Sequence, residues 1–314
     1  MSERALARPG RRLKQWTTFD TVVTVIAIFT CFITIYPMWY VIVMSVSDPA
    51  AAAAGKVTFW PVGFSLGSYK LVLNNPKFWI SIRNSVLYVI VGCVLMLFTT
   101  MSVAYPLTRP NLKCRKLVNL YLIIPMYVGG GMIPSFILVT KLGLYNSPLA
   151  LILPASYSIW NIILCRTYLA SIPHELGEAA FIDGATNMQA LTRIYLPLAK
   201  PVLAVISIYT IVGIWNSWFG AKLYQPNPAI QPVQLYLQKV LVEQSVDLSK
   251  MMEQNMTQEM MEAMTAKAMS ARQLKYSMIV VVTLPIIMVY PMFQKHFVKG
   301  VMLGSLKGLS LIHI

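Results

Sequence analysis

The sequence predicts an all-α integral membrane protein with six transmembrane helices. Of its 314 residues 57% are hydrophobic and only 12% are charged, and the mean hydropathy is +0.62; this is more apolar than an ordinary soluble domain. A helix needs about 20 mostly apolar residues to cross a hydrocarbon layer of about 30 Å. Six runs reach this length without any Asp, Glu, Lys or Arg: 21–45, 84–108, 117–140, 146–165, 201–220 and 276–294.

Basic residues orient the spans. Residues 1–20 form a basic N-terminus with no small-residue cleavage site, so we expect this end to stay in the cytoplasm. Six spans then return the chain to the same side. Residues 276–314 supply the last span and a cytoplasmic tail. The segment 109–116 (RPNLKCRK) lies on that side too, as the positive-inside rule requires. The net charge of +15 is explained by this topology and by attraction to anionic lipid.

The residue types that build metal, nucleotide and nucleic-acid sites are not grouped. Three histidines and four cysteines form no ligand pattern, so the sequence predicts no metal site and no catalytic residue. We interpret the cysteines, which lie in or beside apolar runs, as small packing residues. No GxxxxGK[ST] phosphate loop is present, so the chain is not expected to hydrolyse a nucleotide itself. Basic residues scattered around six spans also argue against a nucleic-acid partner.

The third predicted span contains Gly129, Gly130, Gly131 and Pro134. These residues weaken a helical hydrogen-bond ladder, which fits a helix broken where its backbone faces protein or a water-filled cavity. Small residues also allow helices to pack closely, and the sequence favours neither explanation.

Residues 171–197, between the fourth and fifth spans, predict two short amphipathic helices. Pro173 suits the first turn of one helix. Gly184 permits a sharp turn, and Thr186 with Gln189 has the spacing of a capping box at the start of a second helix. Shape alone fits either a knob that enters a partner or an amphipathic loop on the lipid surface.

The stretch EAAFIDGATNMQALTRIYLP (178–197) resembles the EAA signature of ATP-binding-cassette importer permeases. That signature is E-A-A, three residues, Gly, nine residues and I-x-L-P. In that family the loop is the coupling helix, which sits in a cleft of the cytoplasmic ATPase. The resemblance therefore implies a cytoplasmic coupling loop over 171–197, with its contact residues at Glu178, Ala179, Ala180, Asp183, Gly184, Ala185, Ile194, Leu196 and Pro197.

Further segments extend the likeness over nearly the whole chain. Residues 129–154, 215–224 and 290–308 look like the carbohydrate-uptake branch, and resemble oligosaccharide permeases of the polysaccharide and aldouronate type and the maltose importer's G-type subunit. The resemblance implies a multi-pass protein of the bacterial inner membrane that binds no cofactor. Its implied partners are a second permease subunit in a heterodimer, two ATPase subunits that use ATP and Mg, and an extracellular solute-binding protein.

Six amphipathic side chains in or near the later spans are candidates for the substrate path: Tyr157, Asn161, Tyr209, Trp215, Asn216 and Trp218. A path with rings and amides but no fixed charge suits a neutral, hydroxyl-rich solute. Trp and Tyr near span ends are also typical of the interfacial belt, and for the tryptophans this explanation is as good.

Two segments lie on the outer side of the membrane. Residues 46–83 are expected to form a structural loop along the membrane edge. Residues 221–275 predict a long extracellular loop with a methionine-rich helix, which either contacts the solute-binding protein or packs on its own spans. The length of the loop favours the partner.

Two other functional classes fit the sequence less well than a permease. An ion- or proton-coupled secondary carrier of a small polar solute would need membrane-embedded acids or bases and inverted repeats, and neither is visible. A membrane enzyme would need a cluster of His, Asp or Glu at the membrane face, whereas the acids here are isolated outside the 171–197 loop.

Overall fold

The computed structural model describes residues 17–251 and 273–294 of the chain. Within these residues the regular elements are helices, and one isolated bridge joins Ser47 to Phe64. Four helices are long and apolar enough to cross a membrane, and two bent helix pairs raise that number to six if each pair is one span. The predicted all-α membrane fold is confirmed, and the structure allows four to six spans.

The candidate spans are built from α1 (Thr18–Val46), α4 (Pro76–Thr108), α5 (Arg115–Tyr127), α6 (Met132–Lys141), α7 (Leu149–Ala155), α8 (Ile159–Ala170), α12 (Lys200–Trp215) and the helix Gln273–Gln294. The shorter elements are α2 (Pro49–Ala53), α3 (Gly67–Leu73), α9 (His174–Ile182), α10 (Asn187–Ala190), the π-helix Leu191–Tyr195, α11 (Leu196–Leu198), α13 (Phe219–Tyr224), the 3₁₀ turn Pro228–Ile230 and α14 (Val233–Met251).

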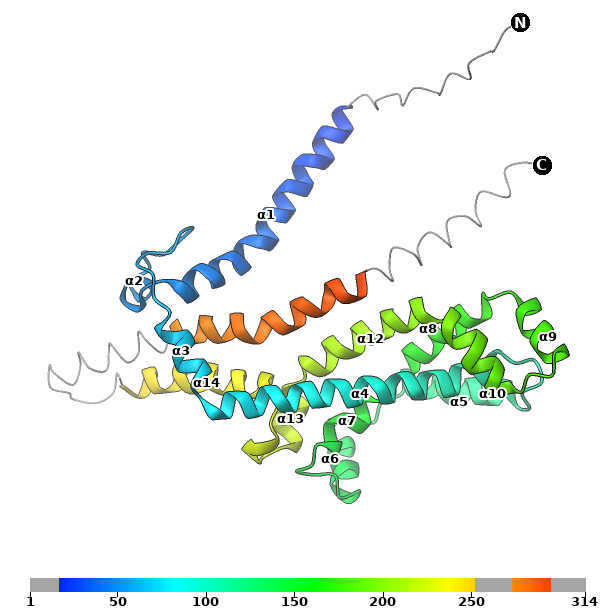
Figure 1. Cartoon of the computed structure of the whole chain (residues 1–314). Coiled ribbons are helices and arrows are strands. Elements are labelled where there is room, and N and C mark those ends of the chain that lie inside the picture. Colours follow the sequence, from blue (N-terminus) through cyan, green and yellow to red (C-terminus); the bar gives the residue numbers. More distant parts are fainter. Residues whose placement is uncertain (1–16, 252–272, 295–314) are drawn as a thin grey trace, which may run out of the picture.

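Helix α4 is the axis of the fold (Figure 1). Its 33 residues span about 50 Å, and it packs against both α8 and α12. Near its C-terminal end Ala104 and Leu107 join a buried cluster with Ile162 and Leu169 of α8 and Ile206 of α12. We call this end of the bundle, where α9 and α10 also lie, the loop end.

The opposite end is held by polar contacts between segments that are distant in sequence. The buried side chain of Gln273 accepts a hydrogen bond from Ser68 Oγ at 2.6 Å and donates to the carbonyl of Ser47. Asn75 Nδ2, just before α4, donates to the hydroxyl of Tyr236 on α14 at 2.9 Å. Buried polar groups need such partners, so these bonds fix α3, α4 and α14 around the helix Gln273–Gln294.

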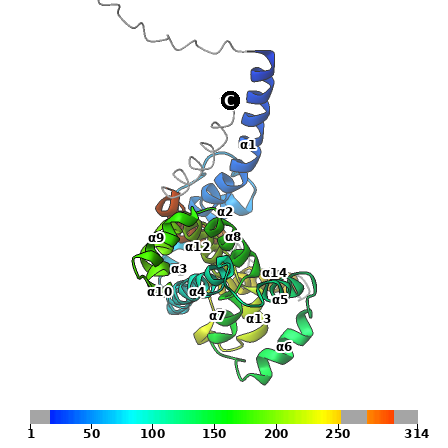
Figure 2. The same ribbon diagram turned by 90° about the vertical axis from the view of Figure 1, so that its right-hand side faces the viewer.

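Helix α1 stands away from the other helices in both views (Figure 1, Figure 2). None of its most apolar 18-residue window is buried, and its buried residues, Val43, Met44 and Ser45, lie at its C-terminal end. Apolar side chains exposed along a helix of this length need lipid or another protein to cover them.

The third predicted span, 117–140, is not one straight helix. Helices α5 and α6 are bent by 115° relative to each other at residues 128–131. Gly131 has φ +81°, and a Cβ atom added at Gly129 or Gly131 would meet no heavy atom within 4 Å. Packing within the part of the chain that the structure describes therefore does not explain Gly129 and Gly131, and the helix is broken at this point.

Other boundaries also differ from the expected ones. Helix α4 begins at Pro76, capped by Asn75, rather than at 84. The uncharged run begins only after Arg83, whereas the helix continues through this arginine and Lys77. The outer segment 46–83 holds α2, α3 and the start of α4 instead of a loop alone. The fifth span, 201–220, ends as a continuous helix at Trp215. Of the predicted methionine-rich helix, α14 covers the part up to Met251, and 252–272 lies outside the described residues.

Candidate functional site

The 171–197 loop folds as two short helices joined by a turn, as its residue pattern predicts. Helix α9 ends at Ile182, and Gly184 takes φ +83°, a left-handed conformation that suits glycine. The capping box is present: Gln189 N donates to Thr186 Oγ1 at 3.3 Å, and Thr186 N donates to Gln189 Oε1 at 2.8 Å. Two backbone donors at the start of α10 are thereby satisfied.

The residues of the resembling signature are mostly solvent-exposed. Glu178, Ala179, Asp183, Gly184, Leu196 and Pro197 are exposed, and Ala180, Ala185 and Ile194 are half-buried. Beside them Ile182 is 85% exposed and Met188 67% exposed, so the tip of the loop presents apolar side chains outside the bundle. Exposed apolar groups of this kind are typical of a surface that contacts another molecule.

Behind the loop, at the C-terminal end of α4, Arg109 lies among aromatic rings and beside a pocket. The guanidinium carbon of Arg109 is 4.4 Å from the ring centre of Tyr105, 4.3 Å from that of Tyr195 and 5.8 Å from that of Phe181. Beside this group is a hollow of about 700 Å³, the loop-end pocket, which is also lined by His174 and Glu178. Sequence reasoning missed Arg109, because it counted this residue only as one of the basic charges of 109–116.

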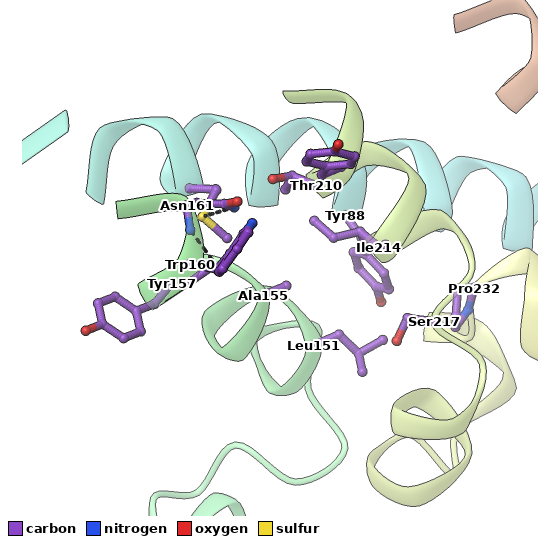
Figure 3. Close-up of a pocket in the computed structure, with 14 residues that line it drawn as sticks. Tyr88, Leu151, Ala155, Tyr157, Trp160, Asn161, Thr210, Ile214, Ser217 and Pro232 are labelled. Atoms are coloured by element: carbon purple, nitrogen blue, oxygen red, sulfur yellow. Dashed lines mark hydrogen bonds between the residues drawn. The ribbon is translucent and has the colours of Figure 1, made fainter. Parts of the chain in front are cut away.

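A different pocket lies between α4, α7, α8 and α12, and we call it the central pocket (Figure 3). Its volume is about 530 Å³. It is lined by Tyr88, Met96, Leu151, Ala155, Tyr157, Ser158, Trp160, Asn161, Tyr209, Thr210, Gly213, Ile214, Ser217 and Pro232. None of these side chains is charged, and four are aromatic, so the pocket offers rings, hydroxyls and one amide to an occupant.

The polar groups of the central pocket are held by its own helices. Asn161 Nδ2 donates to Met96 Sδ at 3.5 Å, and its backbone N–H caps α8 by donating to Ser158 Oγ. Tyr88 Oη donates to the carbonyl of Ile230 at 2.6 Å. In Figure 3 the rings of Trp160 and Tyr88 lie on different sides of the space, whereas the ring of Tyr157 points away from the other labelled side chains.

Three of the six predicted path residues line this pocket: Tyr157, Asn161 and Tyr209. The pocket also contains Tyr88, Trp160, Thr210 and Ser217, which the sequence analysis did not single out. Their signal was present, since Trp160 and Tyr88 are amphipathic rings within or beside uncharged runs, but the sequence does not show which rings face a common space.

The other three predicted path residues lie elsewhere. Trp215 is 4% exposed and donates its indole N–H to the carbonyl of Val282 at 3.3 Å, within a buried cluster. Asn216 Oδ1 accepts from Gln234 Nε2 at 3.2 Å. Trp218 packs edge-on against Phe219, with ring centres 5.7 Å apart. None of the three is among the residues that line the central pocket.

No group of three or more His, Cys, Asp and Glu side chains is placed to hold a metal ion within residues 17–251 and 273–294. The rings, hydroxyls and amide that line the central pocket suit recognition by stacking and hydrogen bonds.

Comparison with known proteins gives one family for this chain. Residues 97–303 match the family described as binding-protein-dependent transport system inner membrane component. The protein LplC of Bacillus subtilis is 38% identical to this chain, over 88% of the chain and 90% of LplC. The polygalacturonan/rhamnogalacturonan transport system permease protein YtcP of the same organism is 32% identical, over 92% of this chain and 98% of YtcP.

A solved structure shows the same fold. One chain in the crystal structure of a bacterial ABC transporter involved in the import of the acidic polysaccharide alginate is 32% identical to this chain. The two superpose with a TM-score of 0.79, over 89% of this chain and 96% of the other. Because the match covers nearly all of both chains, the likeness extends to the whole arrangement of helices.

Proposed function

Because the chain belongs to the family of inner membrane components of binding-protein-dependent transport systems, we propose that it is a permease subunit through which an ATP-driven importer moves an oligosaccharide. As a member of this family it is a transport subunit and not an enzyme. The observation that carries the proposal is the central pocket, which is uncharged and lined by aromatic rings. One of the helices around it, α12, directly follows the 171–197 loop.

Oligosaccharide is the substrate class that this pocket fits. Sugar rings present C–H faces that stack on aromatic side chains, and hydroxyls that pair with amides and hydroxyls. Trp160 and Tyr88 supply the rings, and Asn161, Thr210 and Ser217 supply the polar groups. The relatives support this class, since YtcP is named for two polysaccharides and the structural match imports a third.

The loop and the pocket are mechanically connected. The segment Asn187–Leu198 bends by 75° into α12 with a break of only a residue. Helix α12 then contributes Tyr209, Thr210 and Gly213 to the central pocket. Two rigid helices that meet at a bend form a lever, so a displacement of the 171–197 loop by an ATPase subunit would reorient the wall of the pocket.

The proposed assembly contains two ATPase subunits, a second permease subunit and a solute-binding protein. One of the two ATPase subunits, which use ATP and Mg, would contact the exposed tip of the loop around Ile182 and Met188. A second permease subunit would complete the path and cover apolar surface such as that of α1. A solute-binding protein would deliver the substrate on the outer side. In this arrangement the loop end and both termini lie in the cytoplasm, and the protein resides in the bacterial inner membrane.

Reconstitution into vesicles tests the proposal. The chain is combined with the permease, ATPase and binding protein encoded near it, and uptake of labelled neutral and uronate-containing oligosaccharides is measured. We expect uptake that requires ATP and persists when the proton gradient is collapsed at a fixed ATP concentration. A complex with a hydrolysis-deficient ATPase is the control.

The same experiment decides against the main alternative. An ion- or proton-coupled carrier would lose transport when the gradient is collapsed, with ATP held constant. That result, or uptake that is equal with the hydrolysis-deficient ATPase, would remove the importer proposal.

A further inference from the structure

Three aromatic rings from three elements surround one arginine at the loop end. We call Arg109, Tyr105, Tyr195 and Phe181 the arginine clamp. Arg109 directly follows α4 and Tyr105 is on its last turns, Phe181 is on α9, and Tyr195 closes the π-helix Leu191–Tyr195. The guanidinium lies about equally far from the rings of Tyr105 and Tyr195, at 4.4 and 4.3 Å. Such distances are typical of cation–π contacts.

The local backbone places Tyr195 in this position. The ring is only 3% exposed, and its centre is 5.3 Å from that of Tyr105. It ends the π-helical turn Leu191–Tyr195, and π-helical turns are rare and occur frequently at functional sites. The turn widens the helix just before it enters α11, and so changes the direction in which Tyr195 projects.

Gly177 shows how closely α9 approaches the clamp. A Cβ atom at this position would collide with the hydroxyl of Tyr195 and lie 3.4 Å from Arg109 Nη1. Alanine is the better helix former, so a glycine inside α9 is explained by this contact. The 171–197 loop is therefore seated directly against the arginine.

The rings, rather than hydrogen bonds, hold the central part of the guanidinium. Arg109 Nε is buried and has no hydrogen-bonding partner among the described residues. A second contact joins the same elements, since Tyr105 Oη donates to the carbonyl of Asn187 on α10 at 3.2 Å. Stacked contacts tolerate small changes in angle better than directional hydrogen bonds do, which suits a joint between elements that move together.

We propose that Arg109 is a positioning residue that ties α4 to the 171–197 loop, so that movement of the loop is transmitted to the α4 wall of the central pocket as well as to the walls formed by α8 and α12. The chain connects the loop directly to α8 and to α12 but not to α4. Helix α4 supplies Tyr88 and Met96 to one side of the pocket, and α12 supplies Tyr209 and Thr210 to another. Without the clamp, α4 would follow the loop only through its packing against α8 and α12. This inference rests on the proposed function.

The test measures coupling rather than activity alone. In the reconstituted vesicles, the quantity compared is the number of solute molecules taken up per ATP hydrolysed. The variants Arg109→Gln, which removes the cation, and Tyr195→Leu, which removes a ring, should each lower this ratio by at least about fivefold, the lower end of typical coupling between two sites. Tyr195→Phe keeps the ring and should preserve the ratio. Arg115→Gln, at an exposed arginine in the same basic segment, is the matched control.

The ratio distinguishes positioning from simple stabilisation. A purely structural role would reduce the amount of assembled complex but leave the ratio of the remaining complex unchanged, and that result overturns the inference. Equal ratios for Tyr195→Leu and Tyr195→Phe overturn it as well, even if Arg109→Gln cannot be purified. Loss of both Arg109→Gln and Tyr195→Leu from the membrane also counts against it, because a clamp that only supports the fold gives that outcome. Absence of ATP-dependent uptake by the unaltered chain would instead refute the proposed function.

Discussion

At the scale of single residues, Gly184 is the position in the 171–197 loop where the backbone conformation most restricts the amino acid. Its φ is +83°, and its N–H donates to the carbonyl of Phe181 at 3.1 Å. Proline fixes φ near −65° and has no N–H, so Gly184→Pro cannot keep this turn. We expect transport to be lost while the binding protein still docks on the outer side. Gly184→Ala, which keeps the donor but strains φ, should have a smaller effect. Normal vesicle uptake by Gly184→Pro would contradict the role of this turn.

Trp215 and Trp218 look alike in the sequence and have different roles in the structure. Trp215 is 4% exposed and bonded to Val282, whereas Trp218 is 39% exposed. Truncation of a fully packed Trp typically costs about 3–5 kcal/mol. Trp215→Ala should therefore lower the melting temperature in detergent strongly, and Trp218→Ala should lower it little. Equal shifts for the two variants would refute the assignment of Trp215 to the core.

These two residues show where the sequence is informative. Apolar composition and the absence of charge predict that Trp215 and Trp218 lie near a span end, because insertion into lipid depends on composition. Which of them faces a cavity depends on the rotation of α12 against α4 and the helix Gln273–Gln294, and packing between distant segments decides that rotation. The capping box was predictable because it is local: its two residues, Thr186 and Gln189, are only three positions apart in the sequence.

At the scale of elements, the break between α5 and α6 is the main feature that hydropathy cannot describe. The average hydropathy of 117–140 shows an apolar run but says nothing of the direction of the helix axis. The bend of 115° is set by Gly131 and its neighbours. Non-helical backbone at membrane depth is tolerated where it is buried in protein or lines a water-filled cavity. Val128 is 70% exposed at this break. Because non-helical backbone cannot face lipid, we expect this segment to line a water-filled cavity.

Cysteine labelling can test this expectation. In a chain whose four native cysteines are replaced, Val128→Cys should react with a membrane-impermeant maleimide. Ile90→Cys is the matched control, because Ile90 is 56% exposed but lies within the continuous helix α4, where lipid should protect it. If Val128→Cys is as unreactive as Ile90→Cys, the segment does not face water and the broken helix does not line a cavity.

At the scale of the whole molecule, α4 connects the two ends to which we assign partners. Its N-terminal cap, Asn75, contacts Tyr236 of α14, and its C-terminal end carries Tyr105 of the arginine clamp. The central pocket lies between these points, lined by Tyr88 and Met96 of the same helix. A signal from a binding protein near α14 and a signal from an ATPase at the 171–197 loop would thus meet on one continuous element.

Deletion of the segment 252–272 tests whether this part of the chain contacts the solute-binding protein. The segment follows α14 and contains methionines at 252, 256, 260, 261, 264 and 269, which suit a contact surface that adapts to a partner. Replacing it by a short Gly/Ser linker should leave a folded permease that binds the ATPase, whose hydrolysis the loaded binding protein no longer stimulates. If the methionines pack on the spans instead, the deletion removes buried side chains worth about 1.5–3 kcal/mol each, a large part of a marginal stability. The melting temperature and the stimulated hydrolysis are therefore measured on the same variant. A stable, unstimulated complex supports docking, whereas an unstable one, or a stable one that is still stimulated, rules it out.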